Sequence, residues 1–255
     1  MEYKIAAHTD TGIRKSKNQD GILLNVAHTD YGNVAFGAVC DGMGGLHKGE
    51  LASATMLRML SGWFEVEFPE LLYRGLHMET LKESWNHLIR RANEKLQRYE
   101  KRNSFRMGTT MVSVLLAGKT YYICNVGDSR IYQIRKQVEL LTKDQTFVQQ
   151  EIDSGRMKFE EANTDTRRNI LLQCVGASHK IKPDYYTGTI ESGTVFLLCS
   201  DGFRHMVKEE ELLESLTPKN IKNEYGMKKS LLYLTELNKS RMETDNISSA
   251  LIYVE

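Results

Sequence analysis

The 255-residue sequence predicts an α+β fold, in which a sandwich of two antiparallel β-sheets is flanked by pairs of helices. Two observations lead to this prediction. Short apolar or alternating runs bounded by turn residues are typical of strands, and they follow one another with short connections. Longer segments between them repeat apolar residues at helical spacing. Because no linker rich in serine, glycine or proline interrupts the chain, we expect one domain over residues 1–255.

The N-terminal part of the chain is predicted to form three strands and then two helices. The strands cover residues 3–10, 21–28 and 33–40, which are apolar or alternating runs that end in turn residues. The helices are expected around residues 52–63 and 81–96, because apolar residues recur there three or four positions apart and charged residues fill the other faces.

The rest of the chain returns to strands at residues 109–117, 120–126 and 130–135, which short connections join into antiparallel hairpins. Residues 144–182 are polar and irregular, with one short helix predicted from Phe147 to Ile152, so we expect an excursion from the core. A strand, two helices and a final strand follow at residues 193–200, 208–216, 224–239 and 246–255.

The composition excludes several classes of protein. The net charge is +1 with dispersed lysines and arginines, which argues against a nucleic-acid-binding surface. The longest apolar runs are well short of the ~20 residues that a membrane span needs, and the N-terminus does not resemble a signal peptide. The four cysteines form no CxxC pair, so a zinc knuckle is not expected. We therefore expect a cytoplasmic protein, and no exposed apolar stripe in the sequence demands more than a monomer.

Five aspartates lie at the ends of predicted strands. They are Asp20, Asp41, Asp128, Asp201 and Asp245. Any one of them alone fits a turn, but strand ends on the same side of a sheet converge, and several converging carboxylates repel one another. Hard divalent cations relieve such repulsion and prefer oxygen ligands, so the sequence predicts a magnesium or manganese site. Two such ions can activate a water molecule and clamp a phosphoryl oxygen.

Five short sequence motifs, called words below, occur in this chain in a fixed order: DGMGG (41–45), MGTTMV (107–112), NVGDSRIY (125–132), CSDGF (199–203) and TDNIS (244–248). In these words, their order and their rough spacing, the chain resembles the metal-dependent protein phosphatases of the protein phosphatase 2C type, in their compact bacterial form. The stretch GIRKSKNQD (12–20) fits the first motif of the family less closely.

This resemblance implies a fold and an activity. The implied fold is a two-sheet sandwich flanked by helix pairs, with a binuclear metal site at one edge and a flap at residues 144–182. The implied activity is hydrolysis of phosphoserine and phosphothreonine in proteins by a water or hydroxide that a binuclear Mg²⁺ or Mn²⁺ centre activates. The implied partners are phosphorylated proteins and a Ser/Thr kinase that the phosphatase opposes.

The resemblance also implies which residues hold the metal ions. Asp41 would bridge two ions, and the Gly42 carbonyl would bind one of them. Asp201 and Asp245 would hold the other ion. Asp128 would join Asp201 at a third, weaker site.

Other positions are implied to act on water and phosphate, and three of them depart from the family pattern. Asp20 would orient metal-bound water. Arg14 or Lys15 would grip phosphate: the family places an arginine at the position of Lys15, and a one-residue bulge would restore Arg14, which we favour slightly. Gln19 replaces a glutamate that contacts a metal through water, and Gln145 replaces a histidine that is common at the start of the flap.

Three alternative functions compete with this prediction. Residues 124–130 also spell the C-x5-R loop of cysteine-dependent phosphatases, but a carboxylate at Asp128 does not suit an anion-binding loop. A nucleotide-binding loop has a lysine followed by a serine or threonine after its last glycine, and the GGLHKG stretch does not. A silent phosphatase-fold module that binds a phosphoprotein without hydrolysis remains the principal alternative.

Overall fold

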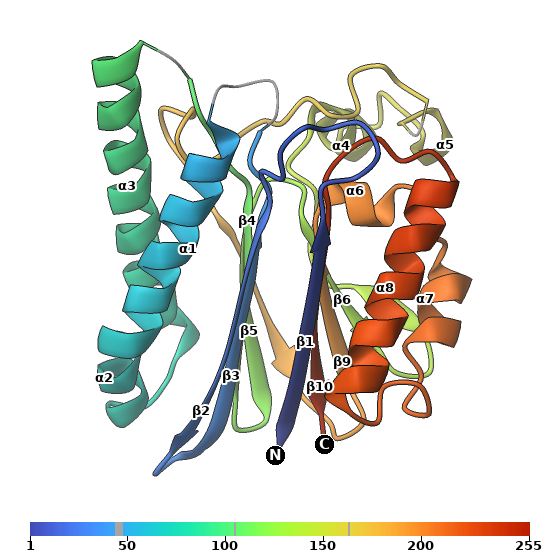
Figure 1. Cartoon of the computed structure of the whole chain (residues 1–255). Helices are drawn as coiled ribbons and strands as arrows, with labels where there is room; N and C mark the ends of the chain where they lie inside the picture. The colour runs from blue at the N-terminus through green and yellow to red at the C-terminus, as the bar shows by residue number, and fades with distance from the viewer. Residues whose placement is uncertain (44–47, 105, 163) are drawn as a thin grey trace.

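The computed structural model describes residues 1–255 except 44–47, 105 and 163, and two sheets lie face to face in its middle (Figure 1). All strand pairings within each sheet are antiparallel. The first sheet contains, in spatial order, β1 (Tyr3–Asp10), β10 (Ile247–Val254), β9 (Val195–Cys199), β6 (Arg130–Ile134) and β7 (Val138–Leu140). The second contains β2 (Gly21–Thr29), β3 (Gly32–Cys40), β4 (Met111–Ala117), β5 (Thr120–Val126) and β8 (Asp184–Thr189).

Helices cover the outer face of each sheet (Figure 1). The second sheet is covered by α1 (Gly49–Val66), α2 (Phe68–Tyr73) and α3 (Met78–Asn103). The first sheet is covered by α6 (Asp201–Arg204), α7 (Glu209–Ser215) and α8 (Glu224–Ser240). The connection from β7 to β8 carries α4 (Phe147–Asp153) and α5 (Phe159–Ala162). This order of helix, sheet, sheet and helix confirms the predicted fold class.

Apolar packing fills each boundary between layers. Val114, Phe196 and Ile252 are among the buried side chains between the two sheets. Trp63 of α1 and Trp85 of α3 pack under the second sheet with their ring centroids 5.6 Å apart. Because burial of a large apolar side chain contributes roughly 1.5–3 kcal/mol, these clusters hold the strand ends in fixed positions.

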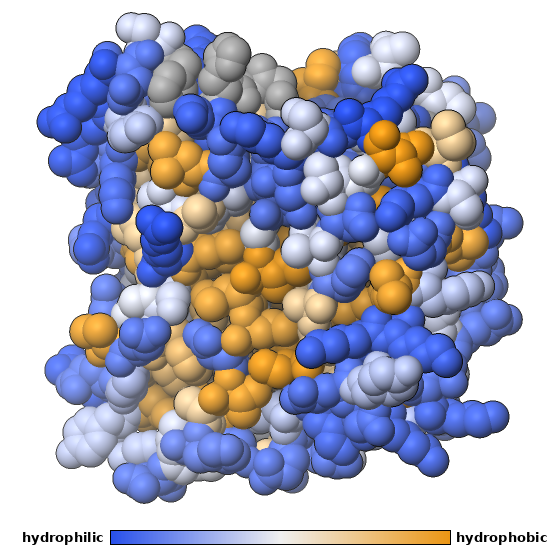
Figure 2. Space-filling model, in the orientation of Figure 1, coloured by the Kyte–Doolittle hydropathy of each residue, from blue (hydrophilic) through white to orange (hydrophobic). Residues whose placement is uncertain are grey.

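One side face of the sandwich is apolar, while the end that carries the connecting loops is hydrophilic. Figure 2 shows apolar residues gathered on the face where β1 and β2 form the sheet edges, and hydrophilic residues around the loops at the top of the view. Within the described residues, the helices include none with the length and apolar character needed to cross a membrane.

Several short elements were not predicted. They are α2, α5, α6, β7 and β8. The sequence DYYTGT of β8 follows the irregular segment and has no long apolar run, and only its pairing with β5 makes it a strand. The strand predicted from residue 109 begins at Met111, because Thr109 forms isolated bridges to Gly42 and Val175 instead. The strand β8 and the bridges of Thr109 depend on contacts with distant parts of the chain, which local periodicity does not encode.

Candidate metal centre

The strand register brings the five aspartates to one end of the sandwich. Gly21 pairs with Cys40, so Asp20 and Asp41 lie at neighbouring ends of β2 and β3. In the other sheet Cys199 pairs with Ser249, which places Asp201 near Asp245 at the start of β10. Cys199 also pairs with Arg130, two residues after Asp128. This end is the loop-bearing top of Figure 1.

The backbone of Asp41 is fixed by two threonines of the MGTTMV word. The Asp41 amide donates to the Thr110 hydroxyl at 2.9 Å, and the Asp41 carbonyl accepts from the Thr110 amide at 2.9 Å and from the Thr109 hydroxyl at 3.0 Å. Thr110 is itself hydrogen-bonded to the Ser129 hydroxyl at 2.7 Å. Sequence reasoning quoted this word without assigning it a role, and its role is to hold Asp41 in place.

The backbone after Asp41 passes very close to the start of α1. A Cβ atom on Gly42 would lie 2.5 Å from the carbonyl oxygens of both Gln19 and Gly49, and one on Gly49 would lie 2.8 Å from the Gly42 carbonyl carbon. Only glycine fits at such a crossing. Gly44 and Gly45 of the same word lie outside the described residues, so only the Gly42–Gly49 crossing is established here.

Asn246 positions the loop that carries the first-motif residues. Its side-chain oxygen accepts from the Gln19 amide at 2.9 Å, and its side-chain nitrogen donates to the carbonyls of Thr11 and Lys17 at 2.9 and 3.1 Å. The Gln19 side chain donates to Glu50 at 3.3 Å. Asn246 was not singled out from the sequence, although it stands inside the TDNIS word.

Three of the five aspartates have raised pKa values because they are buried beside one another. Burial, together with the negative charges of Asp201 and Asp245, raises the pKa of Asp20 to about 7. Burial and then Asp20, Asp201 and Asp128 raise the pKa of Asp41 well above its usual range. Burial and Asp201 raise the pKa of Asp128 to about 7. Such shifts mark carboxylates for which burial and neighbouring negative charges outweigh any positive charge nearby; at Asp128 they outweigh the opposing effect of Arg204.

Unpartnered oxygens accompany these shifts. Neither side-chain oxygen of Asp20 has a hydrogen-bond partner among the described residues, and the same holds for Asp201 Oδ1. The hydroxyls of Ser200 and Ser248 near Asp20 act to lower its pKa, but burial outweighs them. Buried carboxylate oxygens without donors are costly, and a bound cation would satisfy them.

The donor set suits magnesium or manganese. No three histidine, cysteine, aspartate or glutamate side chains of the described chain already stand as ligands around one point. Mg²⁺, however, is usually bound by one or two carboxylates and keeps several waters, so it needs no complete protein cage. Carboxylates that influence one another's pKa beside the Gly42 carbonyl therefore fit two hydrated divalent ions.

Gln145 and Gly127 shape the turn before Asp128. Gly127 has a φ of +105° and a Cβ there would lie 2.7 Å from Thr110, so glycine is required. The Gln145 side-chain oxygen accepts from the Gly127 amide at 2.8 Å, and its nitrogen donates to Asp184 at 2.8 Å. The glutamine that departs from the family pattern thus holds this turn against β8.

Charged side chains of alternating sign connect Asp144, the first residue of the 144–182 segment, with Asp128. Arg130 makes two hydrogen bonds of 2.8 Å to the two oxygens of Asp144. The Arg204 guanidinium lies 3.2 Å from Asp144 and 3.6 Å from Asp128. His205 Nε2 lies 3.7 Å from Asp201. Sequence reasoning missed Arg204, because no local pattern shows that a residue after the CSDGF word faces Asp128.

The two candidate phosphate-binding cations differ in position. Lys15 Nζ lies 3.0 Å from Asp245 Oδ1, and the nearby Asp245, Asp41 and Asp201 all raise the pKa of Lys15. Arg14 is exposed and makes no hydrogen bond or ion pair to any described residue. The structure therefore favours Lys15 over Arg14 as the cation at the site.

The thiol of Cys124 is unsuited to the cysteine-dependent mechanism. Cys124 is fully buried in β5, and burial raises the pKa of its thiol far above the usual range. A nucleophilic cysteine requires a lowered pKa and access to substrate. The C-x5-R spelling is thus a coincidence of the strand and turn sequence.

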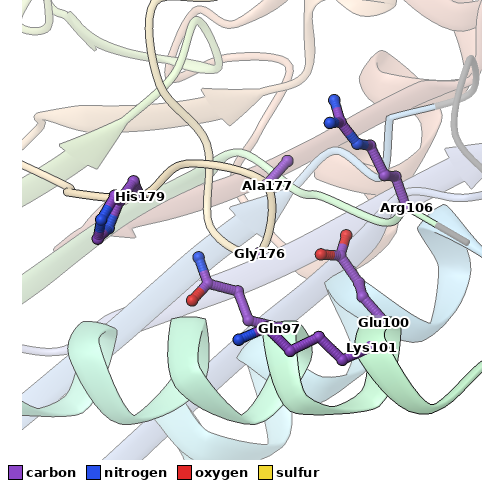
Figure 3. Close-up of a pocket in the computed structure, with 7 residues that line it drawn as sticks. All are labelled: Gln97, Glu100, Lys101, Arg106, Gly176, Ala177 and His179. Atoms are coloured by element: carbon purple, nitrogen blue, oxygen red, sulfur yellow. The ribbon is translucent and has the colours of Figure 1, made fainter. Parts of the chain in front are cut away.

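A surface cavity of about 320 Å³ lies beside the C-terminal part of α3, away from the aspartates. Figure 3 shows the side chains of Gln97 and Glu100 on α3 pointing toward the loop that carries Gly176 and Ala177, with Lys101 beside them on the helix. None of the five aspartates lines it. A second cavity, of about 430 Å³, is lined by residues of the 144–182 segment together with Arg130 and Arg204, and so adjoins the aspartate end.

Comparisons with family models, with known proteins and with solved structures all match this chain to serine/threonine phosphatases. Residues 8–234 match the family model of protein phosphatase 2C. The chain is 32% identical over 250 residues to the serine/threonine phosphatase stp of Listeria monocytogenes serotype 4b, covering 96% of this chain and 93% of that protein. The Streptococcus agalactiae serine/threonine phosphatase superposes with a TM-score of 0.86 at 29% identity over 100% of both chains. The catalytic domain of the phosphatase PstP in complex with 2 manganese ions superposes with a TM-score of 0.79 at 28% identity over 99% and 98% of the chains.

Proposed function

The chain belongs to the protein phosphatase 2C family of metal-dependent serine/threonine phosphatases, and from this premise we propose which of its residues perform the reaction. The reaction is hydrolysis of phosphoserine and phosphothreonine in proteins with Mn²⁺ or Mg²⁺ as cofactor. The observation that carries the proposal is the cluster of buried, undercompensated carboxylates at one end of the sandwich.

Four groups are proposed to hold two ions. The charges of Asp20 and Asp201 both act strongly on the carboxylate of Asp41, so Asp41 is proposed to be the ligand that both ions would share. The Gly42 carbonyl completes one site, and Asp201 with Asp245 completes the other. When bound, the ions supply Lewis acidity, which lowers the pKa of a water molecule and neutralises charge on phosphoryl oxygens.

Asp20 is proposed to orient the attacking water. Both of its side-chain oxygens are buried and have no hydrogen-bond partner among the described residues, so they are available to accept from a water molecule. Gln19, on the same loop, is held by Asn246 and Glu50. It keeps an acceptor oxygen but no charge, so its contact to the centre is proposed to be weak.

Lys15 is proposed to attract the substrate phosphate. Its ammonium group stands among the carboxylates with its side chain 34% exposed, so it can turn toward an incoming dianion when the ions occupy the cluster. A lysine gives a point charge rather than the two-pronged grip of an arginine, which predicts weaker phosphate discrimination.

Residues 144–182 are proposed to be the flap of a single phosphatase domain over residues 1–255. The segment begins at Asp144, which is anchored by Arg130, and carries α4 and α5. The cavity between this segment and α6 includes Arg130 and Arg204 and has exposed apolar Phe159 at its rim. We propose that the substrate chain passes through this cavity on its way to the aspartates.

A cytoplasmic location is proposed from the state of the cysteines. All four cysteines are unpaired and buried, which suits a reducing compartment such as the cytoplasm. A monomer that opposes a Ser/Thr kinase remains our expectation.

The proposed function is tested by turnover of a phosphothreonine peptide and of p-nitrophenyl phosphate. We expect activity with Mn²⁺, its loss on chelation, and a decrease of about 10²–10³-fold in kcat for Asp201→Asn, which removes a charge from the centre. Cys124→Ala serves as the matched control at a buried position and should retain turnover. Absence of manganese-dependent turnover in well-folded protein would instead support the silent module.

A further inference from the structure

The carboxylate of Asp128 already has a cation beside it. The resemblance implies a third, weaker ion between Asp128 and Asp201, yet a guanidinium nitrogen of Arg204 lies 3.6 Å from Asp128 Oδ2. The Asp128 side chain is only 7% exposed and that of Arg204 only 15%. Since a guanidinium stays charged at every accessible pH, this corner of the site carries a permanent positive charge.

Arg204 is held in this position from outside the metal centre. Its guanidinium lies 3.2 Å from Asp144, and Asp144 is fixed in turn by the two-pronged hydrogen bonds of Arg130. The short helix α6 that carries Arg204 is anchored because Asn238 of α8 donates to the Phe203 carbonyl at 2.8 Å. Lys15, in contrast, is about a third exposed, and among the described residues its one ion pair is with Asp245, so its side chain can turn away.

The residues at the third site therefore do not fit a third ion. A divalent cation bound between Asp128 and Asp201 would stand within a few ångströms of a fixed guanidinium, and like charges at that range repel strongly in a partly buried site. His205 further crowds the second ligand, with Nε2 at 3.7 Å from Asp201. Neither Arg204 nor His205 belongs to the sequence words that carry the family resemblance.

We propose that Arg204 replaces the third metal ion in this protein. Its guanidinium neutralises Asp128 and ties it to Asp144 at the root of the flap, so the chain holds two ions and no third. This inference rests on the proposed two-ion centre. It makes the position of the flap root depend on a side chain that is always present rather than on the concentration of a weakly bound ion.

The number of Mn²⁺ ions bound per chain tests this inference. The full-length chain is titrated with Mn²⁺ while free Mn²⁺ is counted by electron paramagnetic resonance and heat is measured by calorimetry. We expect two ions in the wild-type chain, and a third in Arg204→Met, which keeps a long side chain but removes the charge. Arg204→Lys keeps a positive charge and should stay at two ions.

A second variant makes the test independent of how well Arg204→Met folds. If Arg204 fills the third site, Asp128→Asn leaves the wild-type stoichiometry at two, whereas in the Arg204→Met background it removes the third ion. Three ions in the wild-type chain, with one lost in Asp128→Asn, would overturn the inference and leave the two-ion centre intact. Fewer than two ions in the wild-type chain would contradict the proposed centre itself.

Discussion

The buried carboxylate of Asp20 gives the metal-free protein an unusual dependence of stability on pH. Its pKa is about 7 in the folded chain against an ordinary value of 3.8, so over the intervening pH range the folded state holds a proton that the unfolded state has released. This contribution to stability is fully present below about pH 4 and is lost as the pH rises through about 7.

We therefore predict that Asp20→Asn weakens the pH dependence of the metal-free protein. Asparagine cannot ionise, so the loss of unfolding free energy between pH 5 and pH 8 should be smaller than in wild type, by on the order of 2 kcal/mol. Urea unfolding in the presence of a chelator measures it. If the two proteins showed the same pH dependence, the pKa of Asp20 would not be raised in the folded chain, contrary to this prediction.

The positions of Lys15 and Arg14 give a second prediction at the scale of single residues. Lys15→Ala should lower kcat/KM for a phosphopeptide by about 10- to 100-fold, as expected for loss of one charged hydrogen bond of about 1.5–3 kcal/mol. Arg14→Ala, one residue away and exposed, should change kcat/KM by less than about twofold. Lys15→Arg should retain activity. The reverse ranking of the two alanine variants would restore Arg14 as the phosphate ligand.

At the scale of elements, the centre depends on how the end of β3 crosses the start of α1. Gly42 and Gly49 touch there, and the Gln19 carbonyl accepts from the Gly42 amide at 3.2 Å and from the Ser53 hydroxyl at 2.6 Å. Three segments thus fix the direction of the Gly42 carbonyl. A change in any of them should be felt as a change in metal affinity.

Gly49→Ala tests this crossing, with Gly62→Ala as the matched control in the same helix. A Cβ at Gly49 would push on the Gly42 carbonyl, so we expect Mn²⁺ affinity to fall by about 10- to 100-fold. A Cβ at Gly62 meets nothing within 4 Å, so that variant should keep its affinity and gain about 0.5–1 kcal/mol of stability. Calorimetric titration measures the Mn²⁺ affinity of both variants. Equal Mn²⁺ affinities in Gly49→Ala and Gly62→Ala would argue against a ligand role for Gly42.

At the scale of the whole molecule, the sandwich fold determines which parts of the site can be predicted from the sequence. Strand patterns and the aspartates at their ends are local signals, and antiparallel pairing then brings those ends together. The ion pair of Lys15 with Asp245, and the contacts of Gln145 with Gly127 and Asp184, join segments that lie far apart in the sequence. Arg204 meets Asp128 because β6 begins beside the end of β9, where Arg130 pairs with Cys199, and no local pattern records this pairing.

Because the proposed metal ligands lie at strand ends of both sheets, metal binding should stabilise the entire fold. At a free Mn²⁺ concentration of about 100 times its dissociation constant, each bound ion adds about 2.7 kcal/mol, and one such contribution corresponds to a rise in Tm of about 5–10 °C. Asp201→Asn should abolish most of this rise while leaving the metal-free Tm similar or higher. Scanning calorimetry with and without Mn²⁺ measures it, and an equal rise in the variant would place the ions elsewhere.

The central claim is that the aspartate end of the sandwich holds two divalent ions. The anomalous-scattering map of a crystal grown in Mn²⁺ tests it most directly. The account predicts two strong peaks that share Asp41, one beside the Gly42 carbonyl and the other beside Asp201 and Asp245, with Arg204 still at Asp128. A map without a peak beside Asp41 would contradict it.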